Sequence, residues 1–552
     1  MVIYSLTHHM SLFKNIVNVL LLVVFLQSAG PVFCQVVKNT HEKHSVKTPV
    51  KWKGLSPELK ILADPVDDGW LIKVEASNFK FSPEMTGRVH APGQGHMHLY
   101  VSGKKHTRLY GGSYFLNGLT NGEHEIEVTL NSNDHRIYHY EGEKISAKIL
   151  VNHIGKNISS NSPVKNLKDD PNLSLMLNRD LMHGWNVIVK SSGSELDKGW
   201  VQLKVNDVPV GRIYGGHYYL SDFLPERDSL SVTLYDDKNS LCFYKGKTVT
   251  KKLGRAHQLR WFASSINTHP VNRRNGLPDP ELELAYDDQL IYIRSNGIPT
   301  FQFVQRTPNP IEGQDYNWEI PRFPKINDQL QQIPLLGLAA ILTVGLPIYG
   351  PNEAQHPHPY GDPFINEVLD YCHGHTAGRG DYHFHYAPTC LLKTPDGKEE
   401  HYNVVGYSLD GFPIVAHYIS VLDEKGNPIL DANGEFQFNW QEVSGYEPND
   451  SYRRDVLNGS QTSTYVWEQY EYKTSRINRT LDECNGRLLS KRTLSDGKKF
   501  DERDFFKAEY AYFLTGEFPY VIAKYKGVAK VRSGRRSYNR EQGGRRSSSR
   551  RP

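Results

Sequence analysis

The sequence predicts a mainly β protein in which two tandem β-sandwich-like repeats precede a larger, irregular all-β domain. Three observations support this fold class. Aromatic residues make up 11% of the 552 residues, and 32 tyrosines stand against six methionines, a balance typical of strands. Short apolar runs alternate with turns rich in Gly, Asn and Asp, while helical periodicity is scarce. Finally, two stretches of the N-terminal half match each other without gaps.

The N-terminus predicts export. Weakly basic residues precede an apolar run from Val19 to Leu26, and small residues follow, as in a secretory signal peptide at residues 1–34. The run is shorter than the roughly 20 residues that span a bilayer. Cleavage would follow Gly30 or Cys34, and residues 35–54 would form a linker. We therefore expect a secreted, periplasmic or extracellular protein with no transmembrane segment after signal cleavage.

An internal repeat occupies residues 55–155 and 170–254. The stretch GHMHLYVSGKKHTRLYGGSYFL begins at Gly95 and matches GWVQLKVNDVPVGRIYGGHYYL, which begins at Gly199, so the offset is 104 residues. Upstream, the offset that aligns the two Gly-Trp pairs is 115, so the second copy is 11 residues shorter in between. Each copy alternates strand-like runs with turns, which predicts a β-sandwich of about 100 residues.

The two copies differ where the first carries potential metal ligands. His96 and His98 are two residues apart, so both project from the same face of a strand. His135 lies in the turn-like NSNDH, and Met85 lies in the region that the second copy lacks. The aligned residues of the second copy are Trp200, Gln202 and Asn239. This coordinated difference indicates a metal site in one copy only, for copper if the thioether takes part and for copper or zinc otherwise. Independent drift of surface histidines is the alternative.

The stretch CHGHTAGRGDYHFHYAPTC, residues 372–390, places four histidines between two cysteines. If TAGRGD forms the turn of a hairpin, His375 faces His383 and His373 faces His385, which puts all four imidazoles on one face. Such a cluster suits a divalent transition metal, zinc or copper, although histidine pairs also occur on plain surface strands. The nearest carboxylates, either of which could bind the metal or orient an imidazole, are Asp370 and Asp381.

The cysteines frame this cluster. In an oxidising compartment Cys372 and Cys390 form a natural disulfide, which would stabilise the fold by about 3 kcal/mol through the loop that it closes. Cys242 and Cys484 lie far apart in the sequence, and their pairing stays open.

The C-terminal half resembles the YHYH family, whose hallmark combines C-x-G-H with a following Y-H-Y-H. LDYCHGHTAGRGDYHFHYAPTCL carries the hallmark, and SNGIP, GYSLDGFPI, LDECNGR and YAYFLTGEFPY also agree. The resemblance implies an exported YHYH domain, residues 258–530, with site residues Cys372, His375, Tyr382, His383, His385, Cys390 and Asp410. Phe384 replaces the second Tyr of the hallmark, which weakens any tyrosyl chemistry there. The GHMHLY block similarly resembles a β-domain of exported bacterial proteins with a GHAHLY-type motif, which implies class and compartment only.

Three functions remain open. The first is an exported protein that binds copper or zinc through the histidine cluster. The second is a metal-dependent extracellular enzyme, hydrolase-like, with Asp410 or Asp381 as general base. The third is an adhesion or matrix protein without metal chemistry. The chain has no serine-hydrolase elbow, no HExxH, no phosphate-cradling loop and no dinucleotide fingerprint, so we expect no nucleotide partner.

The C-terminal tail, residues 531–552, is strongly basic. From Arg532 onward it holds eight arginines and one glutamate, a charge of +7 where the whole chain carries +4. It has no apolar periodicity, so we expect a disordered segment. Acidic glycans or cell-surface polymers are its candidate partners in an exported protein, and a merely solvated tail is the alternative.

Overall fold

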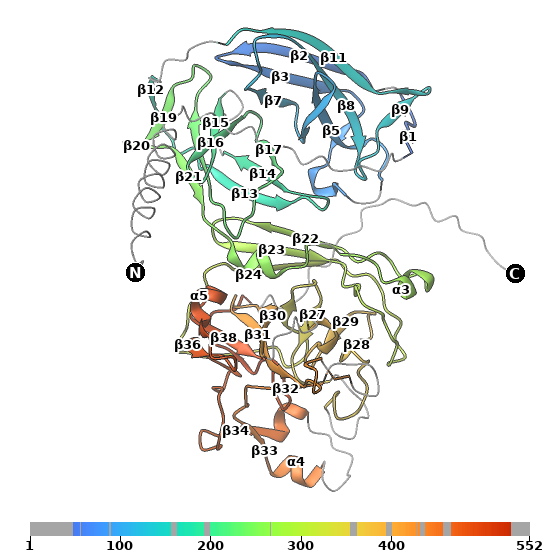
Figure 1. Cartoon of the computed structure of the whole chain (residues 1–552), viewed down its shortest axis with the longest axis vertical. Coiled ribbons are helices and arrows are strands. Elements are labelled where there is room, and N and C mark those ends of the chain that lie inside the picture. The colour runs from blue at the N-terminus through green and yellow to red at the C-terminus, as the bar shows by residue number, and fades with distance from the viewer. Residues whose placement is uncertain are drawn as a thin grey trace, which may run out of the picture. The chain divides into compact units, whose positions relative to one another are not determined.

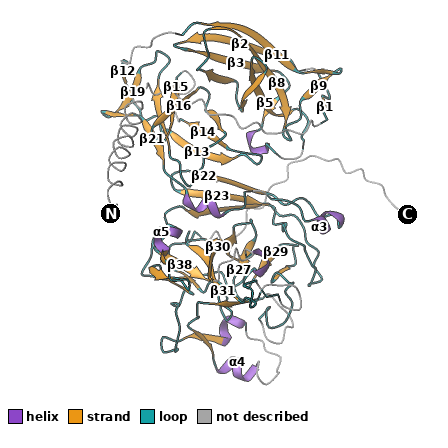
Figure 2. Cartoon of the chain, viewed as in Figure 1, coloured by secondary structure: helices purple, strands orange, loops and turns teal. Residues whose placement is uncertain are grey.

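The computed structural model describes residues 48–530, apart from 56, 88–89, 156–162, 192–198, 265, 354–361, 393–399, 428, 431–436 and 456–464. The predicted signal peptide, most of the predicted linker and the arginine-rich tail lie outside the described residues. Strands dominate the described part of the chain and its helices are short, so the prediction of a mainly β protein is confirmed (Figure 2). No helix among the described residues is long and apolar enough to cross a membrane.

The first repeat folds into two main sheets, drawn in blue and cyan in Figure 1. One sheet has the order β11 (Ser146–His153), β8 (Gly122–Ser132), β5 (Gln94–Val101) and β4 (Lys80–Phe81), with β6 (Lys104–Leu109) paired to β5. The other has the order β2 (Leu59–Val66), β3 (Gly69–Ala76) and β7 (Ser113–Leu116). A small third sheet contains β1 (Val50–Lys51), β9 (Tyr138–Tyr140) and β10 (Glu143–Lys144). Apolar side chains of both main sheets share one core.

Among the described residues, each strand from β2 to β11 except β4 has its counterpart in the second repeat, in the same chain order. Its first sheet has the order β12 (Val164–Asn166), β19 (Leu241–Tyr244), β18 (Leu230–Tyr235), β15 (Trp200–Val205) and β16 (Val208–Ile213), with β20 (Lys247–Thr248) and β21 (Thr250–Leu253) paired to β19 and β18. Its second sheet begins with β17 (His217–Leu220), β14 (Trp185–Lys190) and β13 (Ser174–Arg179). β5, β6 and β8 therefore have their counterparts in β15, β16 and β18, at the offset that the sequence gives.

The two repeats contact each other through an exchanged set of side chains. The guanidinium of Arg108 lies 4.7 Å from the ring centre of Tyr219, and that of the aligned Arg212 lies 4.6 Å from the ring centre of Phe115. The aligned strands make the same exchange, because β6 contacts β17 and β16 contacts β7. A contact that recurs with the two partners interchanged is the pattern of an interface with two-fold symmetry. The repeats thus pack as two copies of one domain would.

Two ion pairs follow the same exchange. Arg108 binds Asp180, which lies between β13 and β14, and Arg212 binds Asp67, which lies between β2 and β3. Their burial differs: the side chains of Arg108 and Asp180 are 2% and 0% exposed, whereas those of Arg212 and Asp67 are 14% and 24% exposed. Only the first pair is fully removed from water.

The C-terminal region is built on a nine-stranded sheet that carries the histidine-rich stretch at one edge. Its order is β28 (Gly374–Thr376), β29 (Tyr382–Phe384), β27 (Pro347–Tyr349), β26 (Leu338–Leu342), β30 (Glu400–Ser408), β31 (Pro413–Ser420), β38 (Tyr510–Phe513) and β35 (Gly486–Leu488), with β32 (Phe438–Trp440) paired to β31. Three two-stranded sheets pair β25 (Gln331–Gln332) with β39 (Lys524–Tyr525), β33 (Tyr446–Pro448) with β34 (Tyr470–Tyr472), and β36 (Lys491–Thr493) with β37 (Lys499–Asp501). The helices are η1 (Pro83–Met85), η2 (His257–Trp261), α3 (Pro270–Arg274), η3 (Thr389–Leu391), α4 (Asp450–Asp455), η4 (Val466–Gln469) and α5 (Glu502–Phe506).

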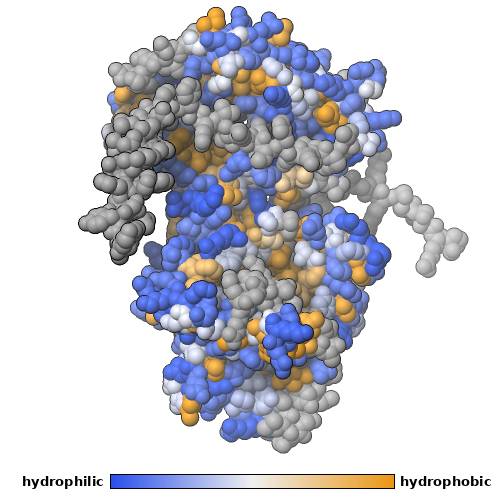
Figure 3. Space-filling view, in the orientation of Figure 1, coloured by the Kyte–Doolittle hydropathy of each residue, from blue (hydrophilic) through white to orange (hydrophobic). Residues whose placement is uncertain are grey.

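The second repeat and the C-terminal region share one hydrophobic core. β13 pairs with β22 (Leu282–Tyr286), which continues the sheet of the repeat through β23 (Leu290–Ser295) to β24 (Tyr316–Pro321). Buried side chains of this sheet and of the nine-stranded sheet form a single cluster, separate from the core of the first repeat. The face shown in Figure 3 is mostly hydrophilic, with apolar residues dispersed over it.

Candidate metal centre

The histidine-rich stretch folds as a short hairpin at the sheet edge. β28 and β29 pair antiparallel with His375 opposite His383, so the register predicted from the sequence is confirmed. In the turn, the Ala377 amide donates to the Asp381 carbonyl at 3.0 Å, and Gly380 takes the left-handed conformation that glycine adopts without strain. β29 also pairs in parallel with β27, which attaches the hairpin to the rest of the sheet.

Strand alternation divides the YHFH stretch between two faces. Tyr382 and Phe384 are fully buried, and both contact the ring of Phe301. His383 and His385 point to the opposite face, as the period of two requires. Phe384 therefore fills the core, and a tyrosine hydroxyl at this position would have to find a partner there.

Three imidazoles and one carboxylate converge on the histidine face. The Nε2 atom of His383 lies 3.2 Å from that of His375 and 3.0 Å from that of His385. An Oε2 atom of Glu353 lies 3.1 Å from Nε2 of His375 and 3.4 Å from Nε2 of His385. The four ligand atoms lie within 4.8 Å of one another. The side chains of His375 and His385 are 2% and 3% exposed, His383 is 2% exposed, and the side chain of Glu353 is 18% exposed.

Backbone carbonyls fix the orientation of two of these rings. Nδ1 of His383 lies 3.1 Å from the Asp381 carbonyl oxygen, and Nδ1 of His385 lies 2.8 Å from that of Gly350. A carbonyl oxygen only accepts, so each Nδ1 carries the proton and each neutral ring keeps its lone pair on Nε2. Two Nε2 lone pairs then face each other at 3.0 Å. This arrangement is unfavourable unless a cation lies between them.

The spacing of the ligand atoms fits a bound transition metal. A tetrahedral ion with bonds of about 2.0–2.1 Å separates its ligands by about 3.3 Å, and a square-planar ion separates adjacent ligands by about 2.9 Å. The four measured separations run from 3.0 to 3.4 Å. Three imidazole nitrogens and one carboxylate oxygen are also the donors that zinc and copper take in proteins.

Burial and neighbouring charges set the protonation of the site. Burial lowers the pKa of His383 well below its usual value, and the imidazoles of His385 and His375 lower it further. Burial would raise the pKa of Glu353, but the interactions of its carboxylate with His375 and His385 outweigh burial and hold that pKa well below its usual range. A neutral imidazole beside an ionised carboxylate is the protonation state that a metal ligand requires.

The carboxylate of the cluster, Glu353, was not predicted from the sequence. The carboxylates predicted there were Asp370 and Asp381, because they are nearest to the histidines in the chain. The structure uses both aspartates elsewhere. Asp381 accepts a hydrogen bond from the Tyr349 hydroxyl, whose ring stacks on His383 at 4.1 Å. Glu353 follows β27, and only the parallel pairing of β27 with β29 brings it to the histidines. No local spacing signals that pairing.

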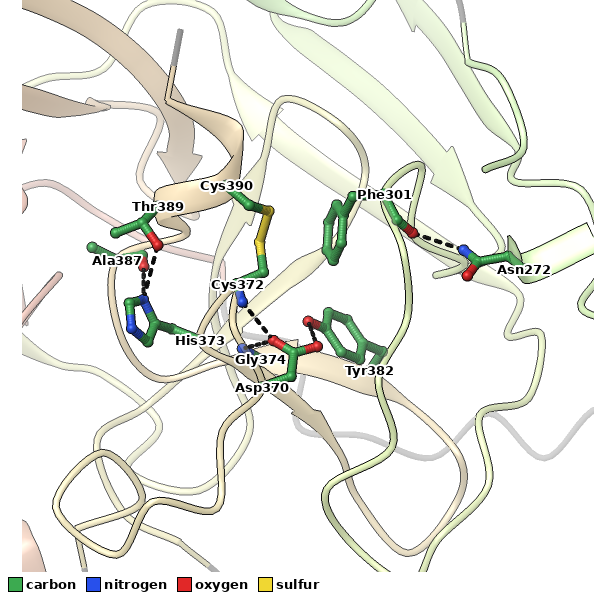
Figure 4. The surroundings of a disulfide bond; sticks show 10 residues. All are labelled: Asn272, Phe301, Asp370, Cys372, His373, Gly374, Tyr382, Ala387, Thr389 and Cys390. Carbon is green, nitrogen blue, oxygen red and sulfur yellow. Dashed lines mark hydrogen bonds between the residues drawn. A yellow bond between two sulfur atoms is a disulfide. The ribbon is translucent and has the colours of Figure 1, made fainter. Parts of the chain in front are cut away.

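Asp370 organises the turn that precedes β28. Its carboxylate accepts the backbone amides of Cys372 and Gly374 and the hydroxyl of Tyr382 (Figure 4). The same turn recurs at LDECNG, where Asp482 accepts the amides of Cys484 and Gly486 and a tyrosine hydroxyl. Asp370 therefore holds the backbone that leads into His375 and lies outside the cluster of ligand atoms.

His373 does not join the other three histidines. It has a left-handed backbone, with φ of 67°, at the same turn position where Asn485 has φ of 62°. Its Nδ1 atom lies 3.0 Å from the Ala387 carbonyl oxygen and 3.1 Å from the Thr389 hydroxyl (Figure 4), and it is not among the converging ligand atoms. The strand pairing begins at Gly374, so the alternation that predicted a fourth ligand stops one residue short.

The disulfide between Cys372 and Cys390 is confirmed (Figure 4). It joins the residue before the His373 turn to η3 and so closes the hairpin on itself. The buried Cys242 and Cys484 are not joined to each other.

Asp410 lies on the β30–β31 hairpin, which is three strands from β29 in the sheet order. At about 4.8 Å per strand this is a distance of about 14 Å from the histidines. Its carboxylate accepts the Tyr512 hydroxyl at 2.6 Å and the Gly527 amide at 2.8 Å. These bonds tie the hairpin to the C-terminal strands, so the structure does not bring Asp410 to the cluster.

The second group of predicted ligands also converges in part. The Nε2 atoms of His96 and His98 lie 3.0 Å apart on β5, and His135 completes a group of three within 4.8 Å. Burial lowers the pKa of both His96 and His98 well below the usual value, and the positive charge of Arg108 acts in the same direction. Met85 lies in η1, which packs on β5.

Comparison with known proteins finds a family match in the C-terminal region. Residues 317–527 match the model of the family described as "YHYH protein". The matched range contains Glu353 and the three histidines of the cluster, so the resemblance noted for this half of the chain is confirmed there. The resemblance of the repeats to a GHAHLY-type domain stays a prediction.

The other comparisons add little. The chain has no match among the curated proteins. One solved structure, titled "Structures of Clostridium thermocellum CbhA fibronectin(III)-like modules", is 14% identical, and the match covers 36% of this chain and 96% of that one with a TM-score of 0.12. A TM-score this low supports no argument about fold or function.

Proposed function

We propose that this chain is an exported metal-binding protein that holds zinc or copper between Glu353, His375, His383 and His385. The observation that carries the proposal is the meeting of two Nε2 lone pairs at 3.0 Å, in rings whose Nδ1 protons are committed to backbone carbonyls. A proton shared between the rings would be the alternative, but it would charge an imidazole whose burial opposes charging. A metal ion removes the repulsion and uses the carboxylate as well.

The ligand set supports holding a metal more than catalysis by it. Structural zinc sites use four protein ligands, whereas catalytic sites use three and leave one position for water or substrate. Here four protein groups converge, and the two carboxylates considered as general bases, Asp381 and Asp410, are engaged by tyrosine hydroxyls. A metal-dependent enzyme would need one of the four ligands, Glu353 as the most exposed, to leave the metal during turnover.

The disulfide supports export. Disulfides persist in oxidising compartments and are rare where thiols are kept reduced. The Cys372–Cys390 bond closes the hairpin that carries the histidines, so the proposed site would form fully only after oxidation. This agrees with the signal peptide expected at residues 1–34.

Metal content of the purified full-length protein tests the proposal. By mass spectrometry the untagged chain should hold about one equivalent of zinc or copper more than the paired variant His383→Ala with His385→Ala, which lacks two of the four ligands. Cobalt, taken up after chelation, should give the intense visible bands of a tetrahedral ion in the wild type and not in the paired variant. The matched control is His373→Asn. It changes a histidine that lies between the same two cysteines but outside the ligand group, and it introduces the residue that occupies the equivalent turn position, Asn485.

The outcomes are distinct. A wild-type chain that binds neither zinc nor copper after careful preparation would overturn the proposal and leave the adhesion-type alternative. Equal loss of metal in the His373→Asn control would show that the fold of the hairpin, and not its ligands, was disturbed. Binding of the tail to acidic glycans is a separate prediction: deletion from Arg532 onward should abolish salt-sensitive retention on a heparin column.

A further inference from the structure

A second group of three imidazoles meets in the first repeat, outside the region that matches the family model. His96 and His98 project from one face of β5, with their Nε2 atoms 3.0 Å apart. The ring of His135, from the turn after β8, lies 4.4 Å from that of His96 and 5.8 Å from that of His98, centre to centre. The three residues are 0%, 5% and 8% exposed in chain order. Three nitrogen donors therefore surround one buried point.

The second repeat shows how the same frame is filled without imidazoles. Trp200 occupies the position of His96, and its Nε1 donates to Oδ1 of Asn239, the counterpart of His135, at 2.9 Å. The indole also stacks on Tyr235, with 4.3 Å between ring centres. In the second repeat a direct hydrogen bond joins Trp200 to Asn239. In the first repeat the imidazole nitrogens of the aligned His96 and His135 converge with that of His98. This arrangement of strands and turn, which we call the strand frame, therefore forms without histidine.

The charge of this cluster differs from that of the site at Glu353. Among the described residues no carboxylate or thiolate joins the three imidazoles. Two cationic side chains, Arg108 and Lys105, act on the imidazoles. Arg108 lies opposite His98 in the β5–β6 pairing and is balanced by the buried Asp180. Three metal-bound imidazoles are neutral, so a divalent ion would leave two positive charges in a buried place and a monovalent ion only one. Burying the larger uncompensated charge costs more.

We propose that His96, His98 and His135 form a three-coordinate site for monovalent copper. Monovalent copper accepts three ligands and imidazole is among its donors, whereas zinc ordinarily completes four protein ligands or adds a water. The enclosed, carboxylate-free trio therefore selects copper in its lower oxidation state. The site at Glu353, with a fourth and anionic ligand, selects a divalent ion. The chain then carries two sites of different selectivity, one in each half.

Competition titrations test this on the full-length, disulfide-bonded chain. Monovalent copper would be titrated against bicinchoninate under argon, and zinc against a chromophoric chelator. The variant His98→Gln with His135→Asn introduces the residues that the second repeat carries in the same frame, including an asparagine at a left-handed position. We expect its affinity for monovalent copper to fall by at least 100-fold while zinc binding at Glu353 is unchanged. His106→Gln, on β6 of the same repeat, is the matched control and should titrate as the wild type.

The two proposed sites can fail separately. The variant His383→Ala with His385→Ala should keep monovalent copper whether or not the first proposal holds, and it should lose zinc if the first proposal holds. Unchanged copper affinity in the His98→Gln, His135→Asn variant would overturn the inference, and so would a first-repeat site that prefers zinc to copper. Circular dichroism of each variant would show that the strands persist, and loss of the strands in the double variant would contradict the equivalence of the two frames on which the inference stands.

Discussion

The two exchanged ion pairs between the repeats give a stability prediction with an internal control. In the first, Asp180 accepts Arg108 at 3.1 Å, the Tyr110 hydroxyl at 2.6 Å and the Met182 amide at 2.9 Å. Asp180→Asn keeps the size of the side chain and removes its charge, which leaves the guanidinium of Arg108 buried without a counter-ion. Breaking a buried pair in this way costs about 3–5 kcal/mol.

The matched change is Asp67→Asn, which removes the acid from the exchanged pair. Arg212 and Asp67 keep 14% and 24% of their side-chain surface in water, so water can solvate the guanidinium that is left. Pairs of this kind contribute about 1 kcal/mol or less. The same chemical change at equivalent places in the two repeats should therefore differ by at least 2 kcal/mol in its effect.

Hydrogen exchange followed by mass spectrometry separates this effect from the unfolding of the rest of the chain. Peptides that cover β5 and β8 report the opening of the first repeat. In Asp180→Asn their slowest amides should exchange about 10²- to 10⁴-fold faster, and in Asp67→Asn less than about tenfold faster. Equal acceleration of amide exchange in the two variants would refute the argument that burial decides how much each ion pair contributes to stability.

Four further predictions concern the C-terminal region. Changing Cys372 and Cys390 to serine should lower the free energy of unfolding by about 3 kcal/mol in urea titrations, because the bond closes a loop across a separation of 18 residues. Phe384→Tyr should destabilise by about 1–3 kcal/mol in the same assay, since it buries a hydroxyl among aromatic rings, and should leave metal content unchanged. Burial would raise the pKa of Glu442, but hydrogen bonds from neighbouring histidine and arginine side chains lower it to about 2. Because the pKa is depressed in the folded protein, the ionised carboxylate adds about 3 kcal/mol to the free energy of unfolding at neutral pH, and this contribution is lost as the pH falls from about 4.5 toward 2. The difference in stability between the wild type and Glu442→Gln should therefore close over that pH range. Chelation of the metal should lower the thermal midpoint yet leave the far-ultraviolet circular dichroism of strands, whereas an unfolded metal-free protein would contradict the proposed role of the site.

The sequence was sufficient to predict those features of the fold and of the candidate site that follow from local periodicity or from repetition. The gapless match between the copies predicted equivalent strands, and the hairpin register followed from the symmetric spacing of His375 and His383 about the turn. The mainly β class followed from composition and turns. These features depend on neighbours in the chain or on direct repetition, both of which a single sequence displays.

The sequence was insufficient where the site depends on long-range pairing or on a single backbone conformation. Glu353 reaches the histidines through β27, whose parallel pairing with β29 has no local signature. His373 has the correct spacing for a ligand, yet its left-handed conformation turns the ring toward Ala387. The expectation that alternate residues share one face holds only within a strand. It fails at His373 because the pairing of β28 with β29 begins one residue later, at Gly374.

A second duplication shows what the histidines add to their frame. The turn at Asp370 and the strands after it recur at Asp482: β35 pairs with β38 as β28 pairs with β29, and Tyr510 bonds Asp482 as Tyr382 bonds Asp370. At the positions of His375, His383 and His385 this second frame carries Arg487, Ala511 and Phe513.

Each half of the chain therefore contains one strand frame with three imidazoles and an equivalent frame with none. In each half, the equivalent frame keeps its strand pairing with ordinary side chains. Folding thus explains the strands, the turns and the buried tyrosines, but it does not explain the imidazoles. The proposed metal binding would account for them in both places. It would also account for Glu353, whose carboxylate would otherwise lie beside two imidazoles without a structural need.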